Sequence, residues 1–208
     1  MSFLSRSDDL PEAYEAPAPA FLPDPWAEAL RRRAAELVGL ALLALGLALA
    51  AALASHHPDD PSFFNATAEA PRNWLGLTGA TLADPMARAL GLAAWAPALI
   101  LAVWGVRLVL HRGDERSWSR LALSPLAVLA AAAAFSAHVP PEGWTAAHGL
   151  GGLVGDSAAR ELFALSPWPP AVSALALSAG LTGAAALATG FALGMDRGET
   201  AALLGWLG

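Results

Sequence analysis

The chain has 208 residues, of which 56% are hydrophobic and only 14% are charged, and its formal net charge is −6. Soluble globular chains carry about 25% charged residues, so this composition argues against a soluble helical domain. The chain has no cysteine, which excludes a disulfide framework and a thiolate metal site, and its acidity argues against direct binding of nucleic acid.

The N-terminal segment 1–23 is acidic, contains four prolines and shows no apolar periodicity. We expect it to be a disordered cytoplasmic tail, because it cannot bury a core. Asp24 and Pro25 suit the start of a helix, since aspartate caps helix N-termini and proline fits the first turn. This helix carries the first long uncharged run, which follows Glu36, and we expect it to cross the membrane at about 35–55.

Three further apolar runs, uncharged except for Arg107 near the end of the first, predict three more membrane spans, at about 89–110, 121–139 and 171–195. Pro97 lies near the middle of the second span, where the loss of a backbone hydrogen bond predicts a kink. The expected fold class is therefore an all-α integral membrane protein, with four transmembrane helices in a domain that covers 24–195.

Polar segments separate these spans. We interpret 56–84 and 142–170 as two extracytoplasmic loops, each with a short interfacial helix, at about 82–92 and 157–165. The glycine-rich stretch 149–155 is not a nucleotide-binding fingerprint, because no strand precedes it. We expect this stretch to be a flexible or re-entrant loop at the membrane surface.

The distribution of arginine predicts the orientation in the membrane. Nine arginines lie in segments expected to be inside, and only three, Arg72, Arg88 and Arg160, lie in the expected outer loops. This bias places both termini in the cytoplasm, including the tail 196–208, which we interpret as the start of a linker. The arginines that we take as topology determinants are Arg31, Arg32, Arg33, Arg107, Arg112, Arg116 and Arg120.

One cluster contains candidate metal ligands, because imidazole and carboxylate groups commonly bind metal ions. Its members are His56, His57, Asp59 and Asp60. The alternative is a polar turn that ends the first span. We favour the turn, because adjacent histidines point in different directions and no second cluster has ligand spacing. No metal or other cofactor is expected.

Small residues recur at every fourth position in the last span, a spacing that permits close approach of helices in a bilayer. The high alanine and glycine content of this span produces such ridges by composition alone, which is the competing explanation. We nevertheless expect this face to pack against another span or a neighbouring subunit. Two adjacent ridges contribute its members, Gly180, Ala184 and Ala188 in one and Gly190 and Gly194 in the other.

The sequences of the spans give little indication of a catalytic site. None carries a charged residue or histidine well inside it, which argues against a pump or a secondary transporter. Ser136 and Ser178 have no histidine deep in a neighbouring span, which argues against an intramembrane serine protease. The chain has no lysine and so no GxxxxGK[ST] loop, and we do not expect it to hydrolyse ATP or to be an enzyme.

Two motifs occupy the two ends of the first outer loop. Ser-x-x-Pro-x-Asp-Pro-Ser occupies 55–62, and Gly-x-x-Gly-Ala-x-Leu-Ala-Asp occupies 76–84. Together with the glycines of 151–155 and the four spans, they resemble the N-terminal four-span membrane domain of FtsK/SpoIIIE-type bacterial DNA translocases. His56 and His57 replace the residues usual in the first motif of that family.

The resemblance covers about 30–195 and implies a membrane anchor at the division septum, in the bacterial inner membrane. It implies contacts with membrane lipid and with other division proteins, a homo-oligomer, and roles in cell division and chromosome segregation. DNA and ATP would be engaged only through a motor domain, which lies far downstream in the family and is not in this sequence. The alternatives are an unrelated four-span scaffold or subunit of a membrane complex and, less favoured, a membrane metalloenzyme that uses the His56 cluster.

Overall fold

The computed structural model describes residues 24–112, 117–144 and 148–195, together with 198, 199, 201, 202 and 205. Its helices are α1 (Asp24–Ala54), α2 (Gly76–Leu90), the 3-10 helix η1 (Gly91–Ala94), α3 (Trp95–Val109), α4 (Ser117–Ser136), α5 (Gly152–Ala164) and α6 (Pro170–Ala192). No strand occurs in these residues. The expected disorder of 1–23 lies outside the described residues, as does most of 196–208, so both assignments stay predictions.

Four helical stretches are long and apolar enough to cross a membrane, by length and composition. They are Pro25–Ala54, Gly76–Val109, Ser119–Ser136 and Pro170–Ala192. The described part of the chain is therefore an all-α, multi-pass membrane protein with four spans, which confirms the expected fold class. The last helical residue of each span comes one to three positions before the end expected from the sequence.

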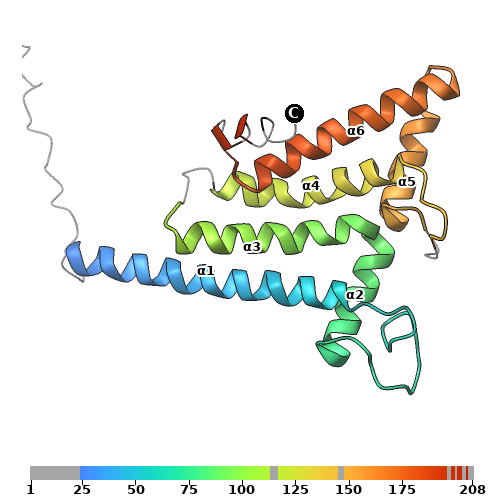
Figure 1. Cartoon of the computed structure of the whole chain (residues 1–208). Helices are drawn as coiled ribbons and strands as arrows, with labels where there is room; N and C mark the ends of the chain where they lie inside the picture. Colours follow the sequence, from blue (N-terminus) through green and yellow to red (C-terminus); the bar gives the residue numbers. More distant parts are fainter. Residues whose placement is uncertain are drawn as a thin grey trace, which may run out of the picture.

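The spans form two hairpins, α1 with α3 and α4 with α6 (Figure 1). Glycines bring the first pair close together. A Cβ atom added to Gly105 would lie 2.5 Å from the backbone nitrogen of Leu43, and one added to Gly46 would lie 2.7 Å from the backbone nitrogen of Ala102. In a bilayer lipid competes for apolar surface, so such close backbone contact is a main source of helix association.

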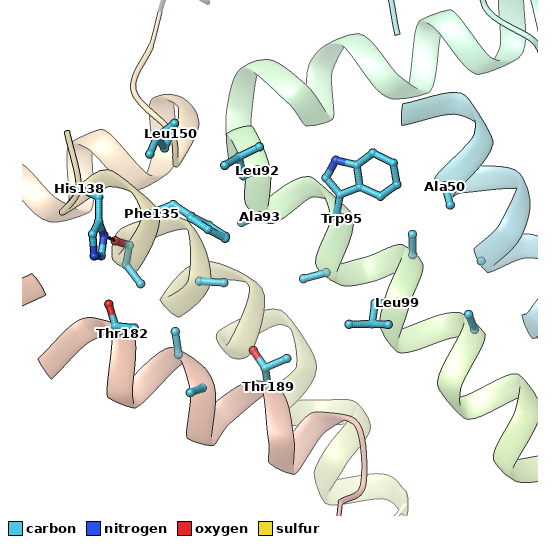
Figure 2. A pocket seen from close by; sticks show the side chains of 18 of the residues that line it. Ala50, Leu92, Ala93, Trp95, Leu99, Phe135, His138, Leu150, Thr182 and Thr189 are labelled. Carbon is cyan, nitrogen blue, oxygen red and sulfur yellow. Dashed lines mark hydrogen bonds between the residues drawn. The ribbon is translucent and has the colours of Figure 1, made fainter. Parts of the chain in front are cut away.

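The second hairpin packs mainly through alanines. Ala132 of α4 and Ala185 of α6 lie in one buried cluster, and Ala192 lies in another with Ile100 of α3 and Ala127 of α4. Most other side chains of α6 are exposed or half-buried. An apolar groove separates the two hairpins over part of their length (Figure 2).

The bend in the second span is at Gly91, and the kink expected at Pro97 is wrong. Pro97 lies in the first turn of α3, where a missing N–H disturbs the helix little. Gly91 instead has φ +57°, a left-handed conformation that favours glycine. From this point α2 turns away from the axis of α3 (Figure 1).

The glycine-rich stretch 149–155 is not a flexible loop. Its second half begins α5, and a Cβ atom at Gly151 or Gly155 would overlap the carbonyl oxygen of Ala132 in α4. The backbone nitrogen of Leu92 also donates a hydrogen bond of 2.8 Å to the carbonyl oxygen of Leu150. These glycines therefore fix α5 against α4 and η1, which requires a close approach that larger residues would block.

Candidate functional site

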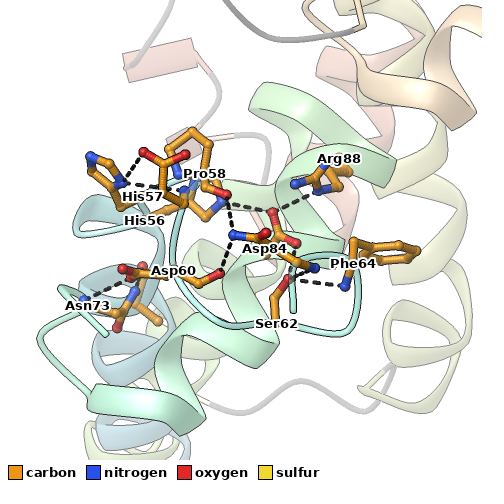
Figure 3. Close-up of polar contacts among 12 residues, drawn as sticks. His56, His57, Pro58, Asp60, Ser62, Phe64, Asn73, Asp84 and Arg88 are labelled. Carbon is orange, nitrogen blue, oxygen red and sulfur yellow. Dashed lines mark hydrogen bonds and ion pairs between the residues drawn. The ribbon is translucent and has the colours of Figure 1, made fainter. Parts of the chain in front are cut away.

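The segment 55–75 joins α1 to α2 at the end of the bundle that also carries α5; we call this end the loop end (Figure 1). Three polar side chains are buried there: Asp60 and Asn73 are each 4% exposed and Asp84 is 1% exposed. Buried polar groups need hydrogen-bond partners, and the partners of these three side chains belong to the loop, to α1 and to α2 (Figure 3).

Asp84 of α2 joins three parts of the chain. Its Oδ1 accepts a hydrogen bond of 2.8 Å from Nε of Arg88 and lies 3.3 Å from Nε2 of His56. Its Oδ2 accepts a hydrogen bond of 2.5 Å from the hydroxyl of Ser62. The Arg88 guanidinium also lies 5.8 Å from the centre of the Phe64 ring. The carboxylate thus holds the end of α1 and the loop against α2.

Asp60 performs the same task for the second half of the loop. Its carboxylate accepts the backbone N–H groups of Arg72, at 2.8 Å, and Asn73, at 3.0 Å. The side-chain amide of Asn73 then donates a hydrogen bond of 2.7 Å to the carbonyl oxygen of Ala52. Ala52 lies in the last turn of α1, where carbonyls lack helical partners, so this contact ties the loop to the end of α1.

The four candidate metal ligands do not converge. His56 faces Asp84, and His57 lies near Asp59 and Arg72, at 3.6 and 3.2 Å. The carboxylate of Asp60 is occupied by backbone amides. In the described part of the chain, no group of three or more histidine and carboxylate side chains is placed to hold a metal ion. The geometry is that of a hydrogen-bonded turn.

Two of the topology arginines meet at the opposite end of the bundle. Arg107 of α3 and Arg120 of α4 donate hydrogen bonds of 2.6 and 3.3 Å to the carbonyl oxygen of Gly194. Arg107 also pairs with Glu199, at 3.2 Å. Positive charge at a helix C-terminus is favourable, so these arginines stabilise the end of α6; their role in orienting the chain stays a prediction.

The remaining topology arginines have simpler surroundings. Arg32 and Arg33 form exposed ion pairs within α1, with Glu28 and Glu36. Arg31 and Arg112 are exposed. Arg116 lies outside the described residues.

The small-residue face expected on α6 has mixed surroundings. A Cβ atom added to Gly180 would have no neighbour within 4 Å, and Ala184 is exposed, whereas Ala188 packs on a buried cluster. Gly190 and Gly194 form the end of the helix instead. The N–H of Met195 bonds to the Gly190 carbonyl at 3.0 Å, and Gly194 has φ +76°, as in the Schellman motif. Packing of Gly180 and Ala184 against a neighbouring subunit stays a prediction.

Two contributors to the loop end were missed by sequence reasoning. Arg88 was counted only as an outer arginine, although it follows Asp84 by four residues, the spacing of a helical ion pair. The side chain of Asn73 also accepts a local hydrogen bond from the N–H of Leu75, but its contacts with Asp60 and Ala52 could not be predicted because those residues are distant in the sequence.

The family described as the 4TM region of DNA translocase FtsK/SpoIIIE matches residues 31–197. The DNA translocase FtsK of Bradyrhizobium diazoefficiens is 40% identical over 144 residues, which are 69% of this chain and 18% of that protein. The protein of the same name in Caulobacter vibrioides is 35% identical over 176 residues, 82% of this chain and 21% of that protein.

The chain therefore spans only about a fifth of the length of these relatives. No solved structure matches it. The motifs that form the buried network of the loop end, 55–62 and 76–84, both lie within the matched residues. The chain belongs to the family of four-span membrane regions of FtsK/SpoIIIE DNA translocases.

Proposed function

We propose that this chain is the membrane anchor of an FtsK-type DNA translocase in the bacterial inner membrane, located at the division septum. Both termini lie in the cytoplasm and the loop end faces outward. The family membership, the four spans and the excess of arginine at one end of the bundle support this proposal. DNA translocation and ATP hydrolysis belong to a motor domain in the part of the relatives that this chain does not cover.

The observation that carries the proposal is the rigid surface built at the loop end. The buried carboxylates of Asp60 and Asp84 hold the loop in place, and the loop presents Phe63 and Trp74, which are 79% and 75% exposed. Exposed aromatic residues on a preorganised surface are typical of protein interfaces. We assign this surface to contact with other division proteins.

The orientation is tested with a reporter enzyme that is active only outside the cytoplasm. Fused after Ala68 it is expected to be active, and fused after Gly208 it is expected to be inactive. Activity after Gly208 together with none after Ala68 would reverse the orientation, and the same result at both sites would contradict the four-span topology.

The septal role is tested with a fluorescent fusion to the full chain in dividing cells. We expect enrichment at the septum in the parent and its loss in the double variant Phe63→Ser, Trp74→Ser. The matched control is Leu165→Ser, which removes an equally exposed apolar side chain after α5. Equal enrichment in both variants would exclude the aromatic surface, and a uniform membrane signal in the parent would exclude septal targeting by this chain.

A further inference from the structure

Two cavities meet at the start of α3. The first is the groove between the hairpins, with a volume of about 970 Å³. The second, of about 590 Å³, lies at the loop end between α2, residues 143–144 and 148–149 before α5, and the end of α1; we call it the polar compartment. Leu92 and Trp95 line both of them, so the groove and the compartment adjoin at these two side chains.

The groove is apolar and short. Alanine, leucine and aromatic side chains line most of it, and along η1 and α3 it runs from Leu92 to Ala102 (Figure 2). The rise per residue of the two helix types makes this about 16 Å, close to half of the roughly 30 Å hydrocarbon core. Two residues further on, the Trp104 indole donates a hydrogen bond of 2.8 Å to the Ala192 carbonyl and joins α3 to α6. The groove therefore ends near the middle of the membrane.

The polar compartment has an accessible positive charge. Its charged residues are Asp84 and Arg88, and its other titratable residues are His56 and His148. The Asp84 side chain is 2% exposed, whereas that of Arg88 is 42% exposed. Arg88 bonds to Asp84 through Nε, and among the described residues its terminal nitrogens have no hydrogen-bond partner. Trp95 and Trp144 also line this compartment, and tryptophan is enriched at the depth of lipid headgroups.

We propose that these two adjoining cavities bind one phospholipid, with an acyl chain in the groove and its phosphate against Arg88. The apolar part has the length of one leaflet, and the polar part offers a guanidinium, a good phosphate donor. A transmembrane helix of a second copy fits poorly, because it crosses both leaflets and the groove ends where α3 and α6 are joined. The identity of the leaflet rests on the proposed orientation, but the binding itself does not.

The groove is tested by filling it. The full chain is purified in mild detergent, and the retention of added phosphatidylglycerol is followed by native mass spectrometry. Ala186 and Thr189 of α6 line the groove. Changing both to leucine displaces at least two acyl methylenes, so we expect retention to fall about tenfold or more. The control Ala174→Leu adds the same side chain on the same helix outside the groove, and retention is expected to match the parent.

The headgroup contact is tested with a second ligand, a diacylglycerol with the same acyl chains but no phosphate. The parent should retain it about tenfold less than the phospholipid, and Arg88→Gln should abolish this preference while Arg88→Lys preserves it. Because the two ligands are compared within one variant, a change in overall stability affects the retention of both and does not by itself abolish the preference for the phospholipid.

Three outcomes would overturn the proposal. The first is that the parent retains no phospholipid, and the second is that the filled groove retains as much as the parent. The third is a dimer of the parent that the groove-filling leucines disrupt while lipid is absent, which would make the groove a contact between copies. Failure of septal targeting or of the reporter experiments would leave the lipid result unaffected, so the two proposals fail separately.

Discussion

The α1–α3 and α4–α6 hairpins are both rich in small residues, but they use them differently. In α1 the two glycines, Gly39 and Gly46, are both buried against the backbone of α3. In α6, Gly180 and Gly183 would have no neighbour within 4 Å of an added Cβ atom, and Gly190 has only the Met195 sulfur at 3.8 Å. The abundance of glycine in a membrane helix therefore does not indicate where that helix packs.

The difference shows when a small residue is informative. Leucine and alanine dominate α1, so its two glycines, seven residues apart, stand out and lie on one face of the helix. In α6 most residues on every side of the helix are alanine, glycine, serine or threonine, so the spacing of small residues selects no face. A small residue predicts close packing when the surrounding sequence makes it rare.

The largest expected effect follows from filling the contact between α1 and α3. A Cβ atom at Gly105 would lie 2.5 Å from the Leu43 nitrogen and 2.7 Å from the Gly39 carbonyl oxygen, and both are backbone atoms that cannot rotate away. Gly105→Leu should lower the free energy of unfolding by about 3 kcal/mol. Thermal unfolding in detergent measures it, with Gly183→Leu as the matched control. Equal stability of the two variants would remove the distinction between the hairpins.

The next effect concerns the connection of the first hairpin, which depends on buried polar groups. Asp84→Asn removes the negative charge that accepts hydrogen bonds from Ser62 and Arg88. We expect a loss of about 2 kcal/mol, the usual range for hydrogen bonds to charged groups. Asp59→Asn, at an exposed carboxylate in the same loop, should change stability by less than about 0.5 kcal/mol. A comparable loss in both variants would indicate a general charge effect.

A smaller effect, with a change of sign, is expected at the end of α6. Gly194→Ala forces a Cβ atom into a left-handed conformation, with φ +76°, and should destabilise by about 1 kcal/mol. Gly190 lies in the helix, and an added Cβ atom would meet only the Met195 sulfur, at an ordinary contact distance of 3.8 Å, so Gly190→Ala should stabilise by about 0.5 kcal/mol. Chemical unfolding of both variants measures the pair, and a loss at both positions would instead favour a tightly packed small-residue face.

The spans and their ends were predictable from the sequence because uncharged length and proline punctuation are local signals. The break at Gly91 was not, because apolar residues continue across it and Pro97 was the more conspicuous candidate. The motifs at 55–62 and 76–84 marked the loop end, but their pairing through Ser62 and Asp84 is a tertiary contact. Likewise, the arginines indicated a side of the membrane, and only the structure shows that Arg107 and Arg120 share the Gly194 carbonyl.

The smallest effect on stability tests whether α6 has a partner outside this chain. Gly180→Leu should change the free energy of unfolding of the single chain by less than about 0.5 kcal/mol, because nothing surrounds the site. If the exposed face packs on a neighbouring subunit, the same substitution should reduce crosslinked oligomer in membranes. Leu175→Ile, an exposed volume-conserving change on α6, is the control for the oligomer yield. Unchanged crosslinking in Gly180→Leu would assign this face to lipid.

The length of α1 has a further consequence for what the protein offers to the aqueous phase. The helix has 31 residues, and the 18 that follow Glu36 extend for about 27 Å, nearly the whole hydrocarbon core. The 13 residues before Leu37 continue along the same axis for about 20 Å, well past a headgroup layer of roughly 5–8 Å. Trp26, 70% exposed near the start of α1, lies eleven residues before Leu37, so an α1 aligned with the membrane normal would carry this side chain about 16 Å beyond the apolar run and past the headgroup layer.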